Sequence, residues 1–139
     1  MPLTPEKRRA YEKAEYAIHG EPEIVLRIGE RSAGLDALLA EANAASAAFI
    51  SSANPYGELT NELENQAARR AFETVVTASW GWFPGEGRDP DPGGEWPAEP
   101  SALILDIPLD EAMRIGRAFG QNAIVFVEKG RAPELVVLV

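Results

Sequence analysis

The fold is decided by residues 47–57, which read Ala-Ala-Phe-Ile-Ser-Ser-Ala-Asn-Pro-Tyr-Gly and pass from an apolar run into a polar turn. The apolar run predicts a strand over about residues 47–52. In the turn, Pro55 pushes Asn54 towards an extended backbone, and Gly57 permits a positive φ. We therefore expect the Asn54 amide to be held in one orientation at the carboxyl end of a strand, where open sheets bind ligands.

Further strands and helices are predicted on either side of this stretch. Apolar runs bounded by proline or glycine predict strands over residues 23–28, 101–107, 123–128 and 134–139. Capping residues and helical spacing predict helices over about residues 5–18, 32–42, 62–79 and 109–120. On the third of these helices, the residues expected in the core are Leu63, Ala67, Ala71, Phe72, Val75 and Val76.

The predicted elements follow the order helix, β-α-β, helix, β-α-β and a last strand, so each crossover unit should be right-handed with two parallel strands. In a ferredoxin-like arrangement the two units run antiparallel, and the end of strand 47–52 meets the starts of strands 101–107 and 123–128. In a doubly wound, all-parallel sheet, Asn54 would lie at the opposite end from Glu99 and Gln121. We favour the ferredoxin-like arrangement, an α/β (α+β) fold with a single-layer mixed sheet of about five strands.

One domain over residues 1–139 fits this length, and a hydrophobic content of 45% is enough for a core. Residues 84–97 interrupt the pattern, because eight of these fourteen residues are proline or glycine. A loop of this length is either a lid over a site or a surface excursion, and we favour the excursion. Its composition predicts greater mobility than that of its flanks.

The composition excludes several classes of site. The chain has no cysteine, which excludes disulfides and zinc-thiolate sites, and its single histidine, His19, cannot build a multi-histidine metal centre. We interpret His19 as the end of the first helix, and we expect no metal and no cofactor. No stretch approaches the ~20 apolar residues that cross a bilayer, and residues 1–9 lack a secretion signal, so we expect a cytoplasmic protein without membrane contact. The net charge of −9 opposes non-specific binding to nucleic acid.

Polar side chains are predicted at three strand junctions and in the first turn of the helix that follows the Asn54 turn. These candidate ligand-binding residues are Asn54, Asn65, Glu99, Ser101, Gln121 and Asn122. Amides offer donors and acceptors, and a carboxylate binds hydroxyl groups, amino groups or a divalent cation, so the set suits a small polar or nucleotide-like ligand. Glu99 is the one candidate general base. The same side chains could instead satisfy buried backbone groups at the strand ends.

Several short motifs occur in a characteristic order along the chain. They are Tyr11 with Tyr16, Phe49-Ile50 followed by Ala53-Asn54-Pro55-x-Gly57, Glu64-Asn65, Trp96 with Glu99-Pro100-Ser101, and Phe119-Gly120-Gln121-Asn122-Ala123. In their order and spacing, from about Tyr11 to Val127, they resemble a bacterial family known as domain of unknown function 3293. The resemblance implies no particular activity. It does imply that the polar junctions are characteristic positions of the family.

Two functions fit these features best, and the remaining alternative is an acidic mimic of nucleic acid or a nucleic-acid binder with a local basic face. The first is a ligand site at the polar edge of the sheet, with or without catalysis. The second is a non-catalytic protein-interaction module that uses the acidic surface or the C-terminal strand, residues 134–139. This strand is apolar and would lie at a sheet edge, where it could pair with a second copy of the chain to form a homodimer.

Overall fold

The computed structural model describes residues 3–91, 94 and 97–139. Within them the α-helices are α1 (Pro5–Lys13), α2 (Ala33–Glu41), α3 (Glu62–Ser79) and α4 (Leu109–Ala118), and a 3-10 turn, η1, spans Pro55–Gly57. The strands are β1 (Glu15–Ile18), β2 (Ile24–Leu26), β3 (Ser46–Ser51), β4 (Trp82–Arg88), β5 (Glu99–Leu105), β6 (Ala123–Glu128) and β7 (Glu134–Val137).

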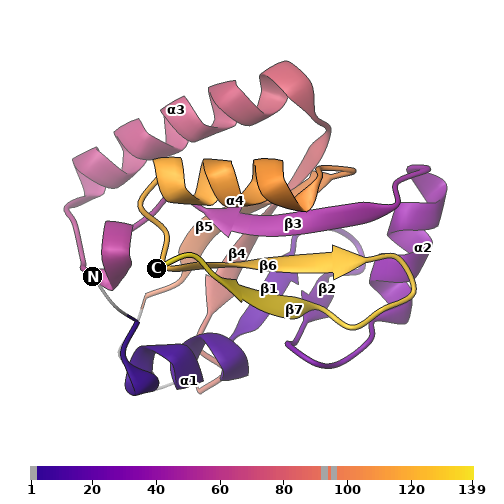
Figure 1. The fold of residues 1–139 in the computed structure, drawn as a ribbon, viewed down its shortest axis with the longest axis horizontal. Helices are drawn as coiled ribbons and strands as arrows, with labels where there is room; N and C mark the ends of the chain where they lie inside the picture. Colours follow the sequence, from indigo (N-terminus) through magenta and orange to yellow (C-terminus); the bar gives the residue numbers. More distant parts are fainter. Residues whose placement is uncertain (1–2, 92–93, 95–96) are drawn as a thin grey trace.

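The strands form one curled sheet in the order β2-β1-β4-β5-β3-β6-β7 (Figure 1). Every neighbouring pair is antiparallel. The predicted single-layer mixed sheet in a ferredoxin-like arrangement is therefore wrong. One relation behind that prediction is present, because β3 lies between β5 and β6 and runs antiparallel to both.

Strand β1 occupies the last part of the segment that was predicted as the first helix. Helix α1 ends at Lys13, Ala14 is extended, and the next four residues pair with β4, the last three of them also with β2. Tyr16 and Ile18 are buried between the neighbouring strands, and this burial outweighs the helical spacing of Tyr11, Ala14 and Ile18 that predicted the helix. His19 follows this strand, and its backbone N–H donates to the carbonyl oxygen of Pro84 (3.0 Å). The interpretation of His19 as the end of the first helix is therefore wrong.

Strand β4 occupies the first part of the segment predicted as a loop. Pro84 and Gly85 lie inside this strand, paired with β5. A Cβ on Gly85 would collide with the carbonyl oxygen of Ala17, so glycine permits the close approach of β1. Pro84 and Gly85 are therefore part of the packed sheet and do not form a turn. Residues 92, 93, 95 and 96 lie outside the described residues, so the predicted mobility of 84–97 stays a prediction.

Apolar side chains pack on both faces of the sheet because alternate residues of each strand point to opposite sides. Helices α3 and α4 cover one face, where Phe72 and Ile115 belong to the same core as Ile50 of β3 (Figure 1). Helix α2 covers the other face, where Leu35 packs in a second core with Phe49 of β3. Helix α1 lies beside the far end of this second face (Figure 1). No helix in the described part of the chain has the length and apolarity to cross a bilayer.

Helix α3 has the predicted bounds, but its buried face is narrower than predicted. Phe72 and Val76 are buried, as expected, whereas Leu63 is 77% exposed and Val75 is 42% exposed. The expected core residues Ala67 and Ala71 are exposed as well. The helix therefore rests on the sheet along one line of side chains near its carboxyl end. At its amino end, polar residues take the place of a core.

Candidate functional site

Three strand junctions meet at one edge of the sheet. Asn54 follows β3, Glu99 is the first residue of β5, and Gln121 lies just before β6. Because β3 is antiparallel to both other strands, its carboxyl end lies beside their amino ends. The structure thus brings together three of the side chains selected from the sequence.

The backbone of the turn after β3 is left-handed at two residues. Asn54 has a φ of 49° and Tyr56 a φ of 59°, so the expectation of an extended Asn54 is wrong. Asparagine enters the left-handed region more easily than most residues. The N–H of Tyr56 donates to the carbonyl oxygen of Gly120 (2.6 Å), and a Cβ on Gly120 would come within 2.8 Å of Pro55. The turn is therefore fixed against the junction that precedes β6.

Asn54, Thr60, Asn65 and Glu99 form one hydrogen-bonded group, here called the amide network. Asn54 Nδ2 donates to Glu99 Oε2 (2.6 Å), and Asn54 Oδ1 accepts from the backbone N–H of Thr60 (3.0 Å) and from Asn65 Nδ2 (3.1 Å). Asn65 Oδ1 accepts from the backbone N–H of Asn54 (3.1 Å) and from the Thr60 hydroxyl (2.5 Å). Asn54 is 5% exposed. These bonds fix both amides and orient the carboxylate.

The other candidate residues have different surroundings. Gln121 donates to two main-chain carbonyl oxygens at the same edge of the sheet. The Ser101 hydroxyl donates to the carbonyl oxygen of Glu99 (2.9 Å). Asn122 is 3% exposed, and within the described residues its Oδ1 has no hydrogen-bond partner. Ser101 and Asn122 lie outside the lining of the cavity at this edge, whereas Gln121 belongs to it.

A cavity of about 490 Å³ lies between α1 and the edge of the sheet. This volume falls within the range of sites for small molecules. Helix α1 provides one wall, and the end of β4 and the strand junctions provide the others. The lining residues that concern us are Tyr11, Tyr16, Asn54, Gly87, Glu99 and Gln121.

Gly87 leaves an open space in the middle of this lining. It pairs with Tyr16 of β1 on one side and with Glu99 of β5 on the other, so the three residues share one face of the sheet. A Cβ on Gly87 would meet only the Tyr16 ring, at 3.9 Å. The missing side chain therefore contributes volume between an aromatic ring and a carboxylate.

Two tyrosines, the half-buried Tyr11 and the buried Tyr16, lie beside that carboxylate. Burial raises the pKa of Tyr11, Glu99 raises it further, and a hydrogen bond from the Asn122 side chain lowers it. Burial is also the main cause that raises the pKa of Tyr16, with Tyr11 and Glu99 contributing. Both phenols therefore keep their protons at neutral pH. The Tyr16 hydroxyl donates to the carbonyl oxygen of Tyr11 (2.5 Å), which connects β1 to the end of α1.

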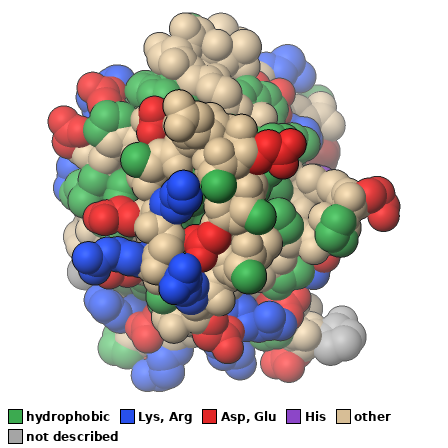
Figure 2. All heavy atoms as spheres, turned by 90° about the vertical axis from the view of Figure 1, so that its right-hand side faces the viewer, with side chains coloured by type: hydrophobic (Ala, Val, Ile, Leu, Met, Phe, Trp, Pro, Cys, Tyr) green, Lys and Arg blue, Asp and Glu red, His purple; other side chains and the backbone are tan. Residues whose placement is uncertain are grey.

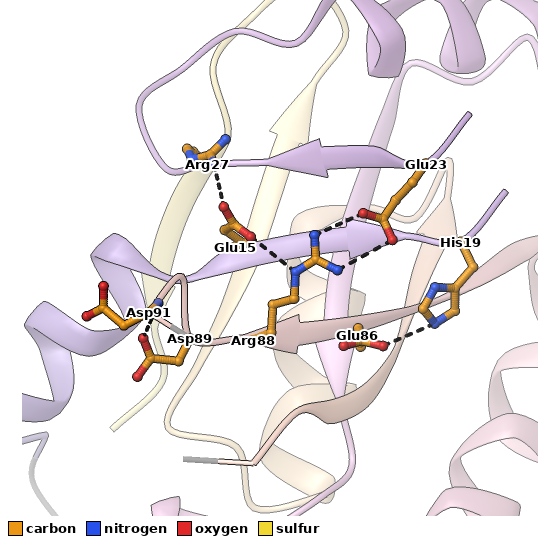
Figure 3. Close-up of polar contacts among 8 residues, drawn as sticks. All are labelled: Glu15, His19, Glu23, Arg27, Glu86, Arg88, Asp89 and Asp91. Atoms are coloured by element: carbon orange, nitrogen blue, oxygen red, sulfur yellow. Dashed lines mark hydrogen bonds and ion pairs between the residues drawn. The ribbon is translucent and has the colours of Figure 1, made fainter. Parts of the chain in front are cut away.

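The opposite face of β1 and β4 carries a group of ion pairs, here called the charged network (Figure 3). Arg88 of β4 donates to Glu15 of β1 (3.1 Å) and to Glu23 (2.9 Å), and Arg27 also pairs with Glu15. Hydrogen bonds from Arg88 hold the pKa of Glu23 below its usual value. Figure 3 shows the Arg88 guanidinium pointing between the two carboxylates. The side chains of Arg88 and Glu23 are 30% and 39% exposed, so this network is partly solvated.

Basic and acidic side chains are mixed elsewhere on the surface too. Figure 2 shows the face that carries α2, where the two kinds are interspersed among apolar side chains. No field of one sign dominates this view. The net charge of −9 is therefore not gathered on this face into one acidic surface.

Sequence reasoning missed two parts of the site. Thr60 belongs to no pattern, and Gly87 fell in the predicted loop. The order Glu86-Gly87-Arg88, with charges on alternate residues, is the feature that could have indicated a strand with one solvated face.

Metal coordination has no support in the described part of the chain. No group of three or more His, Cys, Asp or Glu side chains there could hold a metal ion. The cavity offers a ligand hydrogen-bonding groups, aromatic rings and, on its α1 and β4 walls, charged side chains of both signs.

Comparison with known proteins gives a family but no activity. A family model with the description "Protein of unknown function (DUF3293)" matches residues 50–124, more than half of the chain. This segment includes Asn54, Asn65, Glu99 and Gln121 and leaves α1 outside it. No curated protein and no solved structure matches the chain. The chain belongs to the DUF3293 family.

Proposed function

We propose that the protein binds a small polar ligand in the cavity between α1 and the edge of the sheet. One observation carries this proposal: the polar groups of the cavity are held by other residues before any ligand arrives. Asn54 and Glu99 are held in the amide network, and Gln121 is held by two main-chain carbonyl groups. Groups that are already ordered lose little conformational entropy on binding, so more of the interaction energy remains as affinity.

The lining also combines the two kinds of surface that such a site needs. Tyr11 and Tyr16 offer apolar and aromatic area, and the carboxylate and amides offer directed hydrogen bonds. Gly87 leaves room for a ligand between Tyr16 and Glu99. A strand end stabilised for structural reasons alone does not need that room.

We propose binding and no particular reaction. Glu99 is the candidate general base, because its carboxylate lies in the cavity and is oriented by Asn54. A reaction also requires a nucleophile or a group that stabilises developing charge next to that base. We assign neither to a described residue.

A thermal-shift screen with a matched pair of glycine variants tests the proposal. Nucleotides, nucleosides, amino acids and divalent ions are added to the wild type, to Gly87→Val and to Gly81→Val. A Cβ added to either glycine would have its nearest neighbouring atom 3.9 Å away, but only Gly87 lines the cavity. A ligand at one hundred times its dissociation constant should stabilise the wild type by about 2.7 kcal/mol.

The expected result is a ligand-induced rise in melting temperature for the wild type and Gly81→Val and none for Gly87→Val. Valine suits a strand and fills the open space, so Gly87→Val should fold as well as the wild type. Glu99→Gln should keep the hydrogen bond to Asn54 and change the stability of the free protein by less than ~1 kcal/mol. A ligand whose effect survives in Gly87→Val binds elsewhere and refutes the proposal for this cavity.

An interaction module is the second candidate. Its support is that β7 lies at one edge of the sheet with half-buried apolar side chains and, among the described strands, pairs with β6 alone. A homodimer through this strand would appear in sedimentation as a concentration-dependent mass. Val136→Lys should abolish such a dimer, because a charge opposes edge pairing. A single-species monomer at high concentration would remove this candidate.

A further inference from the structure

The hydrogen bonds of Gln121 determine which of its atoms can meet a ligand. Gln121 is 8% exposed, and its Nε2 donates to the carbonyl oxygens of Ala53 (3.1 Å) and Phe119 (3.2 Å). Both amide hydrogens are thus engaged, and the opposite amide orientation would set oxygen against two carbonyl oxygens. In the described part of the chain no residue donates to Oε1, so this side chain presents an acceptor to the cavity that it lines.

The second polar group of the cavity is also an acceptor. Glu99 presents a carboxylate beside the open space over Gly87. Its negative charge contributes to raising the pKa of both Tyr11 and Tyr16, which places it in their electrostatic environment. Asn54 adds no competing acceptor, because Thr60 and Asn65 already donate to its Oδ1.

The basic side chains around the cavity already have partners. Arg88 binds Glu15 and Glu23 on the other face of the sheet. On α1, Lys7 donates to the carbonyl oxygen of Tyr56, Lys13 lies 3.8 Å from Asp91, and Arg9 lies 4.0 Å from Glu6. An anionic ligand would have to compete for these cations. Gln121 offers an acceptor to a cationic ligand, and Glu99, which already accepts from Asn54, adds negative charge beside it.

We propose that the ligand is a primary amine with an aromatic or apolar body, whose ammonium group binds Glu99 and Gln121 and whose body lies against Tyr11 and Tyr16. This inference rests on the proposed ligand-binding function. An ammonium group has three donors and no acceptor, which matches a carboxylate and an amide oxygen. The faces of tyrosine rings attract cations as well as apolar groups.

Three probes of similar shape test this assignment: benzylamine, benzyl alcohol and benzoate. Each is titrated into the full-length isotope-labelled chain while its amide resonances are followed by NMR. Benzylamine should shift the resonances of Glu99, Gly87 and Gln121. Benzyl alcohol should bind with an affinity at least about tenfold lower, and benzoate should leave these resonances unchanged.

Two carboxylate variants provide the matched control. Glu99→Gln should weaken benzylamine binding by about tenfold or more, because it removes the charge but keeps a hydrogen-bonding side chain. Glu86→Gln removes a carboxylate from the neighbouring position of β4, on the face that carries His19, and should change nothing. Gly87→Val should block both benzylamine and the more weakly bound benzyl alcohol.

The possible results separate this inference from the proposed function. Benzoate that binds the cavity more tightly than benzylamine, or benzylamine binding that Glu99→Gln leaves unchanged, would overturn the amine assignment and keep the binding site. If none of the probes moves the cavity resonances but a member of the screen above binds and Gly87→Val blocks it, the amine assignment also fails. If neither the probes nor the screen gives a ligand whose binding Gly87→Val blocks, the amine assignment and the proposed binding function both fail. Because the probe series uses the wild type, it decides the matter even if a variant does not fold.

Discussion

Strands β1 and β4 carry two polar groups of different character on their two faces. On one face, Tyr16 and Gly87 border a cavity whose carboxylate, Glu99, is held by a buried amide. On the other, Arg88 lies between Glu15 and Glu23 in the charged network, with its side chain 30% exposed. Adjacent residues of the same strands thus face a fixed, partly desolvated site and a solvated surface.

This difference in burial shows which polar contacts contribute most to the stability of the fold. In the amide network, a buried group that loses its partner cannot turn to water, so the loss costs the full desolvation of that group. In the charged network, each ion can be rehydrated and salt screens the attraction, so the contribution of a pair is small. Hydrogen bonds of similar length should therefore have unequal effects on stability.

Asn54→Ala should have the largest effect, a loss of about 3 kcal/mol in the free energy of unfolding. The substitution leaves Asn65 and the Glu99 carboxylate without the bonds that Asn54 supplies and places alanine in the left-handed region. Urea denaturation measures the loss. Asn54→Gly removes the same bonds but fits the backbone, so it should lose about 1 kcal/mol less. A loss below about 1 kcal/mol for both variants would show that water replaces the network.

Gln121→Leu should come second, with a loss of about 2 kcal/mol, because two main-chain carbonyl oxygens lose their donor. The matched control is Gln66→Leu on the exposed side of α3, where Nε2 donates to Glu62 (3.1 Å). That variant should change the free energy of unfolding by less than about 0.5 kcal/mol. Equal losses in the two variants would contradict the distinction between buried and solvated polar contacts.

Arg88→Gln should cost less than about 1 kcal/mol, although Arg88 bonds to two carboxylates. Its effect should shrink further in high salt, whereas that of Asn54→Ala should not. Urea denaturation at low and high ionic strength measures both. A large loss that salt does not reduce would place the charged network in the same class as the amide network.

Acid should produce the smallest effect. The pKa of Glu23 lies below its ordinary value of 4.5 because Arg88 donates hydrogen bonds to it. A carboxyl group with a lowered pKa stabilises the folded state above its unfolded pKa, and this stabilisation is lost as the pH falls through the folded pKa. The difference in melting temperature between the wild type and Arg88→Gln should therefore narrow as the pH falls below 4.5. A difference that widens on acidification would contradict this cause.

The sequence predicted α3 and β6 with their observed bounds because their patterns are long or continuously apolar. It failed on β1 and β4, whose burial depends on partners far away in the chain. Tyr11, Ala14 and Ile18 recur at helical spacing, and Pro84 with Gly85 is typical of a turn. The pairing of β1 with β4 decides both cases, and no local pattern encodes it.

The proximity of Asn54, Glu99 and Gln121 could be predicted because it depends only on β3 running antiparallel to β5 and β6. The ferredoxin-like arrangement of the whole sheet was nevertheless wrong. This antiparallel relation involves only three strands, and the polar residues after β3 and before or at the start of β5 and β6 were the reason to predict it. The cavity could not be predicted in the same way. Its volume depends on Gly87, in a segment predicted as loop, and on α1, whose position depends on the end of the helix at Lys13.

Helix α1 would affect the timing of ligand exchange at the proposed site. None of its nine residues is buried, and it forms one wall of the cavity. A segment with so little buried area can separate from the sheet by local opening, at a free energy well below that of global unfolding. Association would then be gated, with a rate that scales with the open fraction of α1. A ligand that touches both α1 and the strand ends would slow amide hydrogen exchange in α1 while leaving exchange in β3 unchanged.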